Sequence, residues 1–255
     1  MAERSALAAQ MYTLREFCQS PPDIARTCAK VRKLGFEAIQ VSAFGPIAPK
    51  ELAKILSNEG LTCCATHVGF ERLRDQPQQV AEEHQLWGCR HTAVPVTPEP
   101  YRSAGRYGDF GQELNRLAKT LQPLGLAVSY HNHSFELRKF NGRTGLEMLY
   151  ASAEPRLVNA EIDTYWIQHG GGDPAAWITR LGPRQPLLHL KDMVMGPESQ
   201  LMAEVGEGNL NWPAILQAAQ QAQVQWYIIE QDVCQRDPFE SLKISFENLR
   251  RMGIH

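Results

Sequence analysis

The stretch LGLAVSYHNHSFEL, residues 124–137, begins as an apolar run and ends in a polar cluster. The run has the composition of a buried strand, and the side chains of a strand alternate between its two faces. His131 and His133 are therefore expected to point to the same side, at the carboxyl end of the strand. An apolar strand that ends in metal-capable side chains is a pattern that recurs along this chain, and it predicts the fold.

Short strand-like runs alternate with segments of helical periodicity along the whole chain. Strands are expected at residues 6–12, 36–42, 61–67, 91–96, 126–132, 157–163, 186–192 and 225–231. Helices are expected at 22–34, 49–59, 77–87, 110–122, 143–152, 173–181, 212–223 and 237–250. Eight strands alternating with eight helices in about 250 residues predict an α/β protein with one domain over residues 1–255, a single (β/α)8 TIM barrel.

A doubly wound open sheet is the rival fold, because it also alternates strands and helices. Two features of the sequence count against it. No GxGxxG motif follows the first strand, and the polar residues of interest lie late on strands five to eight.

The overall charge and composition limit the classes of partner that can be expected for this protein. The 255 residues carry a formal net charge of −2 without a Lys/Arg-rich run, which gives no support to a nucleic-acid partner. No apolar stretch approaches the roughly 20 residues that span a bilayer, so no membrane partner is expected. Residues 1–16 carry charges where a signal peptide needs an apolar core, and the six cysteines form no CxxC motif. We expect a cytoplasmic protein with reduced thiols.

The carboxyl ends of barrel strands converge on one site, so strong donors and acidic groups at these ends are the candidate functional residues. They are His67 on strand three, His131 and His133 on strand five, Asp163 on strand six, His189 and Lys191 on strand seven, and Glu230 and Asp232 on strand eight. Singly, Asp163 could cap a turn and His189 could be a satisfied core histidine. Together, imidazoles and carboxylates on four successive strands predict a site for Mn²⁺, Fe²⁺, Co²⁺ or Zn²⁺.

Several segments together resemble the xylose isomerase-like TIM-barrel superfamily. The resemblance is to its sugar-phosphate isomerase/epimerase branch, which includes inosose dehydratases and ketose 3-epimerases. The segments are QMYTLRE (10–16), YHNHSFEL (130–137), EIDTYWIQHGGGDPAAWI (161–178), HLKDM (189–193), EVGEGNLNWPAIL (204–216) and WYIIEQD (226–232). The resemblance implies one divalent metal ion, with Mn²⁺ as the first candidate before Co²⁺, Fe²⁺ and Zn²⁺.

By position, Asp163, His189 and Glu230 match the last three metal ligands of the family. The family often has a glutamate as the first ligand, on strand five, in the triplet Glu-Asn-His. Here the triplet is His-Asn-His, so the resemblance makes His131 the substituted ligand and His133 the substrate-facing histidine. The change keeps a ligand but removes a carboxylate that many family epimerases use as one of two opposed bases.

The chemistry of such a site is proton transfer next to a carbonyl, through an enediolate that a divalent ion stabilises. The candidate catalytic residues are Glu230 as ligand and base, His133 as a second base, and Lys191 as a donor to a substrate oxygen. The candidate substrate-binding residues are His67, Trp166 as an apolar plane, and Glu207 in the GEG loop of residues 206–208. Glu136 and Glu204 are expected at the surface.

Together with the resemblance, these residues predict a divalent-metal-dependent isomerase or epimerase acting on a keto-sugar or a related polyol derivative. A metal-dependent dehydratase is the alternative, because the same enolate can expel a β-hydroxyl. A DNA repair enzyme similar to the apurinic endonucleases would need further ligands, and Trp166 stands where one of them is expected. A non-catalytic binding barrel is disfavoured by the intact ligands. A small carbohydrate is the expected partner, and a homo-oligomer is left open.

Overall fold

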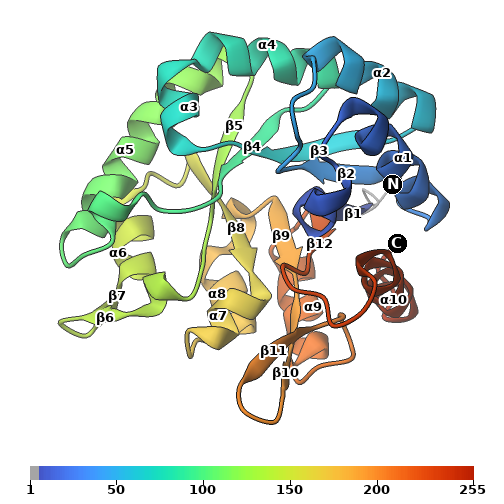
Figure 1. The fold of residues 1–255 in the computed structure, drawn as a ribbon. Helices are drawn as coiled ribbons and strands as arrows, with labels where there is room; N and C mark the ends of the chain where they lie inside the picture. Colours follow the sequence, from blue (N-terminus) through green and yellow to red (C-terminus); the bar gives the residue numbers. More distant parts are fainter. Residues whose placement is uncertain (1–5) are drawn as a thin grey trace.

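The computed structural model describes residues 6–255, in which eight parallel strands close into a barrel (Figure 1). The strands are β1 (Ala6–Gln10), β2 (Ala38–Val41), β3 (Thr62–His67), β4 (His91–Val94), β5 (Ala127–His131), β8 (Val158–Asp163), β9 (Leu187–Leu190) and β12 (Trp226–Ile229). They follow one another around the barrel in chain order, and β12 pairs with β1 to close it. The predicted (β/α)8 TIM barrel is confirmed, with a strand in each predicted position.

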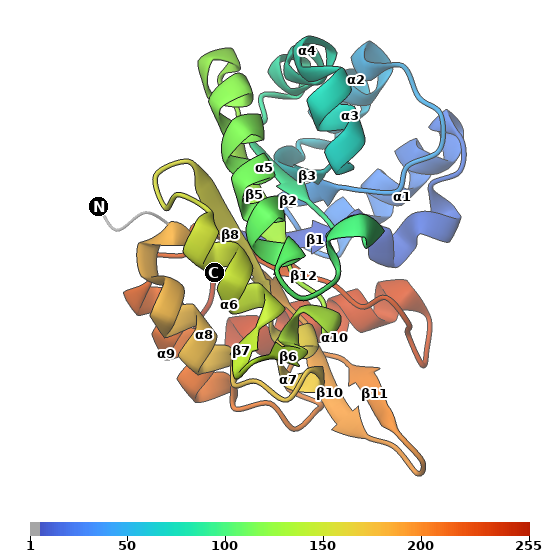
Figure 2. The ribbon, with the colours of Figure 1, turned by 90° about the vertical axis from the view of Figure 1, so that its left-hand side faces the viewer.

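The predicted helices surround the barrel, as two views at right angles show (Figures 1 and 2). They are α1 (Pro21–Lys33), α2 (Pro49–Glu59), α4 (Pro77–Trp87), α5 (Arg106–Leu121), α6 (Gly145–Ser152), α8 (Pro174–Leu181), α9 (Trp212–Gln221) and α10 (Pro238–Arg251). Their ends are encoded locally. Thr144 and Glu147 form a capping box at the start of α6, and Gly60 ends α2 with a φ of 64°.

Shorter elements that the sequence analysis did not predict occupy the connections. The helical ones are η1 (Met11–Phe17), α3 (Phe70–Asp75), η2 (Glu99–Tyr101), η3 (Gln122–Leu124), η4 (Phe135–Leu137), α7 (Thr164–His169) and η5 (Gly182–Arg184). Two hairpins are formed by β6 (Lys139–Phe140) with β7 (Arg143–Thr144), and by β10 (Asp192–Met195) with β11 (Gln200–Ala203). The β10–β11 hairpin projects from the barrel in both views. The first strand was predicted to reach residue 12, which is wrong, because η1 begins at Met11.

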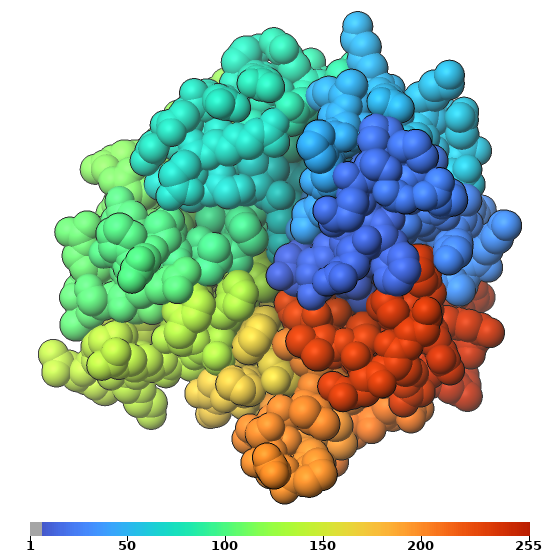
Figure 3. All heavy atoms as spheres, in the orientation of Figure 1, coloured from blue at the N-terminus to red at the C-terminus, as the bar shows by residue number. Residues whose placement is uncertain are grey.

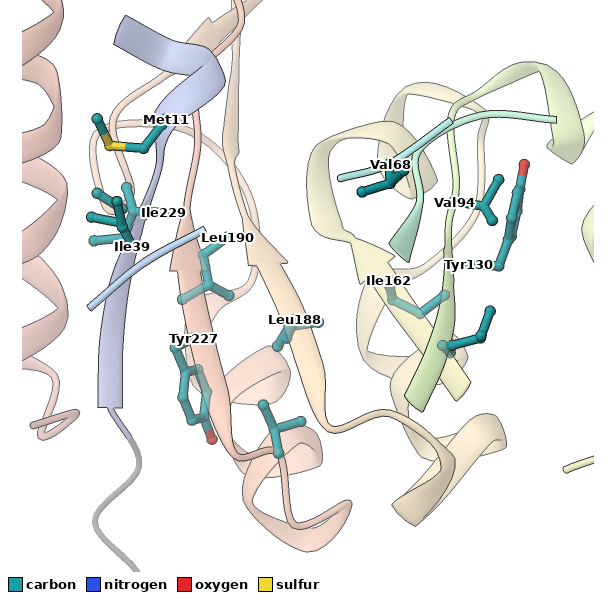
Figure 4. Close-up of a cluster of buried hydrophobic side chains, with 14 of the residues drawn as sticks. Met11, Ile39, Val68, Val94, Tyr130, Ile162, Leu188, Leu190, Tyr227 and Ile229 are labelled. Carbon is teal, nitrogen blue, oxygen red and sulfur yellow. The ribbon is translucent and has the colours of Figure 1, made fainter. Parts of the chain in front are cut away.

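The alternation of side chains along the strands separates two environments. One set of strand side chains packs in the apolar layer with the helices, where Leu188, Leu190 and Ile162 are fully buried (Figure 4). The other set fills the barrel interior, where a small apolar cluster contains Ala8, Cys64, Leu187 and Ile228 among others. Towards the carboxyl ends of the strands, the interior side chains become polar, and this end carries the candidate site.

The first and last segments of the described chain lie against each other on one face of the molecule, as the pairing of β1 with β12 requires (Figure 3). Among residues 6–255, none of the helices combines the length and apolar character needed to cross a membrane.

Candidate metal and substrate site

The four predicted metal ligands meet at the carboxyl end of the barrel. His131 and Asp163 are the last residues of β5 and β8, His189 lies in β9, and Glu230 follows β12. One ligand atom from each side chain lies within 4.8 Å of the other three, and all four residues are buried. The structure thus brings together the set of residues that the sequence analysis assigned to one site.

The spacing of these ligand atoms suits a single divalent ion. His131 Nε2 lies 3.3 Å from Asp163 Oδ2, and His189 Nδ1 lies 3.0 Å from Glu230 Oε2 and 3.8 Å from Asp163 Oδ2. Nitrogen and oxygen ligands bind such ions at about 2.0–2.2 Å, which places neighbouring ligand atoms roughly 3–3.6 Å apart. The observed separations are therefore close to those of a coordination shell.

The hydrogen bonds of the two histidines direct their lone pairs into this cluster. His131 Nδ1 lies 3.1 Å from the Pro95 carbonyl oxygen, which can only accept, so the proton is on Nδ1. His189 Nε2 donates in the same way to Gln40 Oε1 at 2.6 Å. In a neutral ring, the other nitrogen then faces a carboxylate acceptor, which is unfavourable unless a proton or a cation lies between them. The donor set therefore fits a cation.

The pKa of His189 also shows that the surrounding carboxylates favour a positive charge at this place. Burial lowers this pKa, but Glu161 and Glu230 outweigh the effect of burial and raise it to about 10. The carboxylates thus favour a proton on His189, at the place where a metal ion would otherwise sit.

Lys191 supplies one positive charge to the cluster. Its side chain is fully buried, and Nζ lies 3.1 Å from Asp163 Oδ2 and 2.9 Å from Glu230 Oε2, with a further bond to Asp232. Burial lowers the pKa of Lys191, but the three carboxylates raise it well above its usual value. An ammonium has three donors, and here Nζ donates to Asp232 and forms ion pairs with Asp163 and Glu230. The predicted role of Lys191 as a donor to the substrate therefore requires some of these bonds to be released.

Asp163 fulfils both roles that the sequence allowed. Its Oδ2 atom faces the cluster, while its Oδ1 accepts a hydrogen bond from the Trp166 amide at 2.9 Å and caps α7. The Asp163 amide donates to Asn132 Oδ1 at 3.0 Å. These bonds hold the carboxylate in a fixed orientation.

The sequence analysis missed Glu161, which lies two residues before Asp163 on β8. Its side chain is fully buried in the barrel, with Oε1 2.8 Å from Gln40 Nε2 and Oε2 2.7 Å from His67 Nε2. Burial raises the pKa of Glu161, but His189 and His67 outweigh burial and hold it well below its usual value. The alternation that points Asp163 inward also points Glu161 inward, so the signal was present in the sequence.

His67, a predicted substrate-binding residue, belongs to the same cluster. Its ring stacks on that of His189 with centroids 5.2 Å apart and lies 5.0 Å from that of His131. Because Nε2 is turned towards Glu161, the structure places His67 partly in the interior network beneath the ligands. Its contact with a substrate stays a prediction.

His133 and Trp166 form an aromatic wall beside the ligands. Their ring centroids are 5.3 Å apart, Phe135 stacks on His133, and Lys191 Nζ lies 5.5 Å from the centre of the Trp166 ring. His133 Nδ1 and Trp166 Nε1 are buried and have no hydrogen-bond partner among the described residues. Buried polar atoms without partners are costly, so a bound molecule is the expected partner. Burial and His131 lower the pKa of His133 to about 3, which leaves this ring neutral at neutral pH.

Glu136 was expected at the surface, and this expectation is wrong. The strand ends at His131, and the turn η4 folds Glu136 back beneath it, where the side chain is fully buried. Its Oε2 accepts from the His133 amide at 2.9 Å, and the Tyr130 hydroxyl donates to Oε1. Glu136 thus fixes the backbone that carries His133, and burial raises its pKa from 4.5 to about 7.

The variant Glu136→Gln should reduce the loss of stability at high pH. A carboxyl whose pKa is higher in the folded than in the unfolded chain contributes stability that is complete below pH 4.5 and is lost as the pH rises through about 7. Glutamine resembles the protonated carboxyl, so the variant should gain roughly 3 kcal/mol over the wild type across this range. Urea unfolding of both proteins on either side of the range measures this gain. A difference that does not change with pH would contradict the burial argument.

The backbone amides of both glycines in the GEG loop donate hydrogen bonds to the Asp192 carboxylate, so the loop is not arranged to bind an external anion. Asp192 Oδ2 accepts from the amides of Gly206 and Gly208 at 2.9 and 3.1 Å and from Trp212 Nε1 at 2.5 Å. A side chain at 208 would collide with the Asp192 carboxylate, so this position requires glycine. Its amides are therefore engaged within the protein.

Two glutamates near this loop lie in different environments. Glu204, expected at the surface, is buried and accepts a hydrogen bond from Ser241 Oγ at 2.6 Å, so that expectation is wrong. Glu207 is exposed, and the structure does not join it to the ligand cluster within residues 6–255. The predicted contact between Glu207 and a substrate stays a prediction.

Comparisons with known proteins agree with this architecture. A family model described as a xylose isomerase-like TIM barrel matches residues 28–252. An inosose dehydratase from Mesomycoplasma hyopneumoniae is 24% identical over 179 residues, which cover 60% of this chain and 57% of that protein. The match thus spans less than two thirds of the length of this curated relative.

Two solved structures share the fold. A sugar phosphate isomerase/epimerase from Parabacteroides distasonis superposes with a TM-score of 0.81 at 22% identity, covering 98% of this chain and 95% of the other. A probable 3-DHS dehydratase from Bacillus anthracis has a TM-score of 0.71 at 14% identity, covering 96% and 98%. At these identities the similarity establishes the fold alone.

Proposed function

The chain belongs to the xylose isomerase-like TIM-barrel family, and from this premise we propose that it is a divalent-metal-dependent isomerase or epimerase. The proposed substrate is a keto-sugar or a related polyol derivative, and the proposed ion is Mn²⁺, with Co²⁺, Fe²⁺ and Zn²⁺ as alternatives. The proposed ligands are His131, Asp163, His189 and Glu230.

The observation that carries the proposal is the excess of buried acceptors at the candidate site. The buried carboxylates of Asp163 and Glu230 and the partly exposed one of Asp232 share a single ammonium, that of Lys191. The two histidine ligands add lone pairs that face two of these carboxylates. Burying such groups is expensive unless a cation compensates them. A divalent ion bound there would polarise a substrate carbonyl and lower the energy of the enediolate.

The surrounding residues would bind the substrate and move its proton. In the metal-free site, the Lys191 ammonium pairs with Asp163 and Glu230. Once these two carboxylates bind the metal ion, the ammonium can donate to a substrate oxygen instead. Trp166 Nε1 and His133 Nδ1, which lack partners in the protein, can bind further oxygens. His133 and Glu230 are the two candidate bases for the carbon-bound proton; both are deprotonated at neutral pH, and the lowered pKa of each weakens it as a base in the metal-free site.

A metal-dependent dehydratase is the second candidate function, and one feature of the site favours it. Strand β5 provides the imidazole of His131 instead of a carboxylate, so the site lacks one of two opposed carboxylate bases. Elimination of a β-hydroxyl needs one base for the carbon-bound proton, and an acid such as Lys191 for the leaving group. The similarity to an inosose dehydratase supports this alternative.

A panel of keto-sugars and inososes in D₂O with Mn²⁺, followed by NMR, tests both functions. We expect deuterium to enter a carbon next to the carbonyl of the substrate, because both reactions begin with removal of that proton. Rearranged sugar supports the isomerase or epimerase, and loss of water supports the dehydratase. The control is the same protein after chelation of the metal. Failure of every compound to exchange in the presence of Mn²⁺ would contradict the proposal.

The proposed setting is the cytoplasm, with a small carbohydrate as partner. All six cysteines are free thiols, which is common in reducing compartments. The buried acidic site suits a small molecule better than a nucleic acid, whose phosphates require basic side chains.

A further inference from the structure

A polar network lies inside the barrel, next to the four candidate ligands. It joins residues from five strands, β1, β2, β3, β8 and β9: Gln10, Gln40, His67, Glu161 and His189. Four of these side chains are fully buried, and His67 is nearly so. The interior of such barrels is normally filled by apolar side chains, so a buried carboxylate at this place needs a reason.

The carboxylate of Glu161 determines the orientation of the Gln40 amide. A carboxylate can only accept hydrogen bonds, so the group 2.8 Å from Glu161 Oε1 must be the Nε2 donor of Gln40. Gln40 Oε1 then points the other way, towards His189 Nε2 at 2.6 Å. Gln10 Nε2 also donates to this oxygen at 2.9 Å, which holds the amide in the same orientation.

The orientation of Gln40 in turn determines which nitrogen of His189 is free. Because Gln40 Oε1 is an acceptor, His189 Nε2 must carry a proton. The remaining nitrogen, Nδ1, is the one that faces Glu230 and Asp163. His131 has the opposite arrangement, with its proton on Nδ1 towards Pro95 and Nε2 towards Asp163.

We propose that Glu161, acting through Gln40, is a positioning residue that makes His189 bind the divalent ion through Nδ1. This inference rests on the proposed function, since it presupposes the metal site. Hydrogen-bond partners of this kind fix the tautomer of a histidine ligand and raise its affinity for the metal.

The variant Glu161→Gln tests the proposal by metal affinity. An amide at 161 can donate as well as accept and carries no charge, so only the hydrogen bond from Gln10 is left to hold the orientation of Gln40. The dissociation constant for Mn²⁺, measured by isothermal titration calorimetry, should rise about 10- to 100-fold. The matched control is Glu204→Gln, which removes another buried carboxylate, one bonded to Ser241 outside this network, and should leave the affinity unchanged.

A double variant separates positioning from a merely structural role. In Gln40→Glu with Glu161→Gln, the carboxylate and the amide are exchanged between the same two positions. The carboxylate at 40 can accept directly from His189 Nε2, and the amide at 161 can donate to it and accept from His67. Mn²⁺ affinity should therefore return to within about threefold of the wild type, because the tautomer is again fixed.

The second readout is the ligating nitrogen itself. In ¹⁵N-histidine spectra of the Zn²⁺-loaded protein, we expect one ring bound through Nδ1 with a proton on Nε2, assigned to His189. A second ring, His131, should be bound through Nε2 with a proton on Nδ1. Both assignments follow from the hydrogen bonds of the two rings.

Three results would overturn the proposal. These are wild-type affinity in Glu161→Gln, a double variant as weak as that single variant, or His189 bound through Nε2. If the wild-type protein binds no divalent ion at all, the proposed function fails instead. The Mn²⁺ affinity of the wild type therefore distinguishes a failure of the positioning proposal from a failure of the proposed function.

Discussion

Replacing Glu230 by glutamine is expected to lower the rate of substrate deuterium exchange by at least about 1000-fold, because one change removes a metal ligand and a candidate base. Glu230 Oε2 lies 3.0 Å from His189 Nδ1 and 2.9 Å from Lys191 Nζ, so its charge is central to the site. The barrel should remain folded, since glutamine has the same shape. The exchange rate with Mn²⁺ and the circular dichroism spectrum together measure this expectation.

The matched control is Glu247→Gln on the surface helix α10. Glu247 is more than half exposed, and its ion pair with Lys243 spans 3.8 Å, so this variant should keep the wild-type rate. Wild-type exchange in Glu230→Gln would show that the proposed site is not the reacting one. A loss of exchange that accompanies a loss of folded structure would be assigned to folding, which the spectrum detects.

The variant Lys191→Met is expected to have opposite effects on stability and on metal affinity. Removing the ammonium leaves Asp163, Glu230 and Asp232 without their cation, and breaking a buried ion pair in this way costs about 3–5 kcal/mol. The metal-free variant should therefore unfold at a much lower urea concentration. Mn²⁺ should bind more tightly than to the wild type, because a neighbouring positive charge has been removed.

Deuterium exchange by Lys191→Met should fall even when the site is saturated with Mn²⁺, because the proposed donor to the substrate is missing. Calorimetry and urea unfolding with and without Mn²⁺ measure the two effects separately. Lys243→Met, which changes an exposed lysine on α10, is the control and should alter neither quantity. Unchanged stability of the metal-free variant, or weaker Mn²⁺ binding, would contradict the view that Lys191 neutralises the cluster.

The fold and the location of the candidate site could be predicted from the sequence because both depend on simple periodicities. Alternation along each strand points every second residue inward, and parallel strands of a barrel bring their carboxyl ends together. These two rules place His131, Asp163, His189 and Glu230 at one end of the barrel together with other polar residues, and the family resemblance then selects these four as the ligands.

The environment of these residues could not be predicted, because it depends on contacts between distant segments. Gln40 lies 121 residues from Glu161, and its hydrogen bonds give Glu161 a role that the sequence analysis did not assign. Glu136 lies beyond the end of a strand, where alternation no longer applies, and the turn buries it. Lys191 was recognised as a candidate, but its three carboxylate partners became visible only in three dimensions.

The most direct test of the central claim is the anomalous difference map of a crystal grown with Mn²⁺, recorded near the manganese absorption edge. The account predicts a single peak at about 2.0–2.3 Å from His131 Nε2, Asp163 Oδ2, His189 Nδ1 and Glu230 Oε2, with Lys191 Nζ turned away from at least one of these carboxylates. A map without a peak among these atoms, with Lys191 still bridging Asp163 and Glu230, would contradict it.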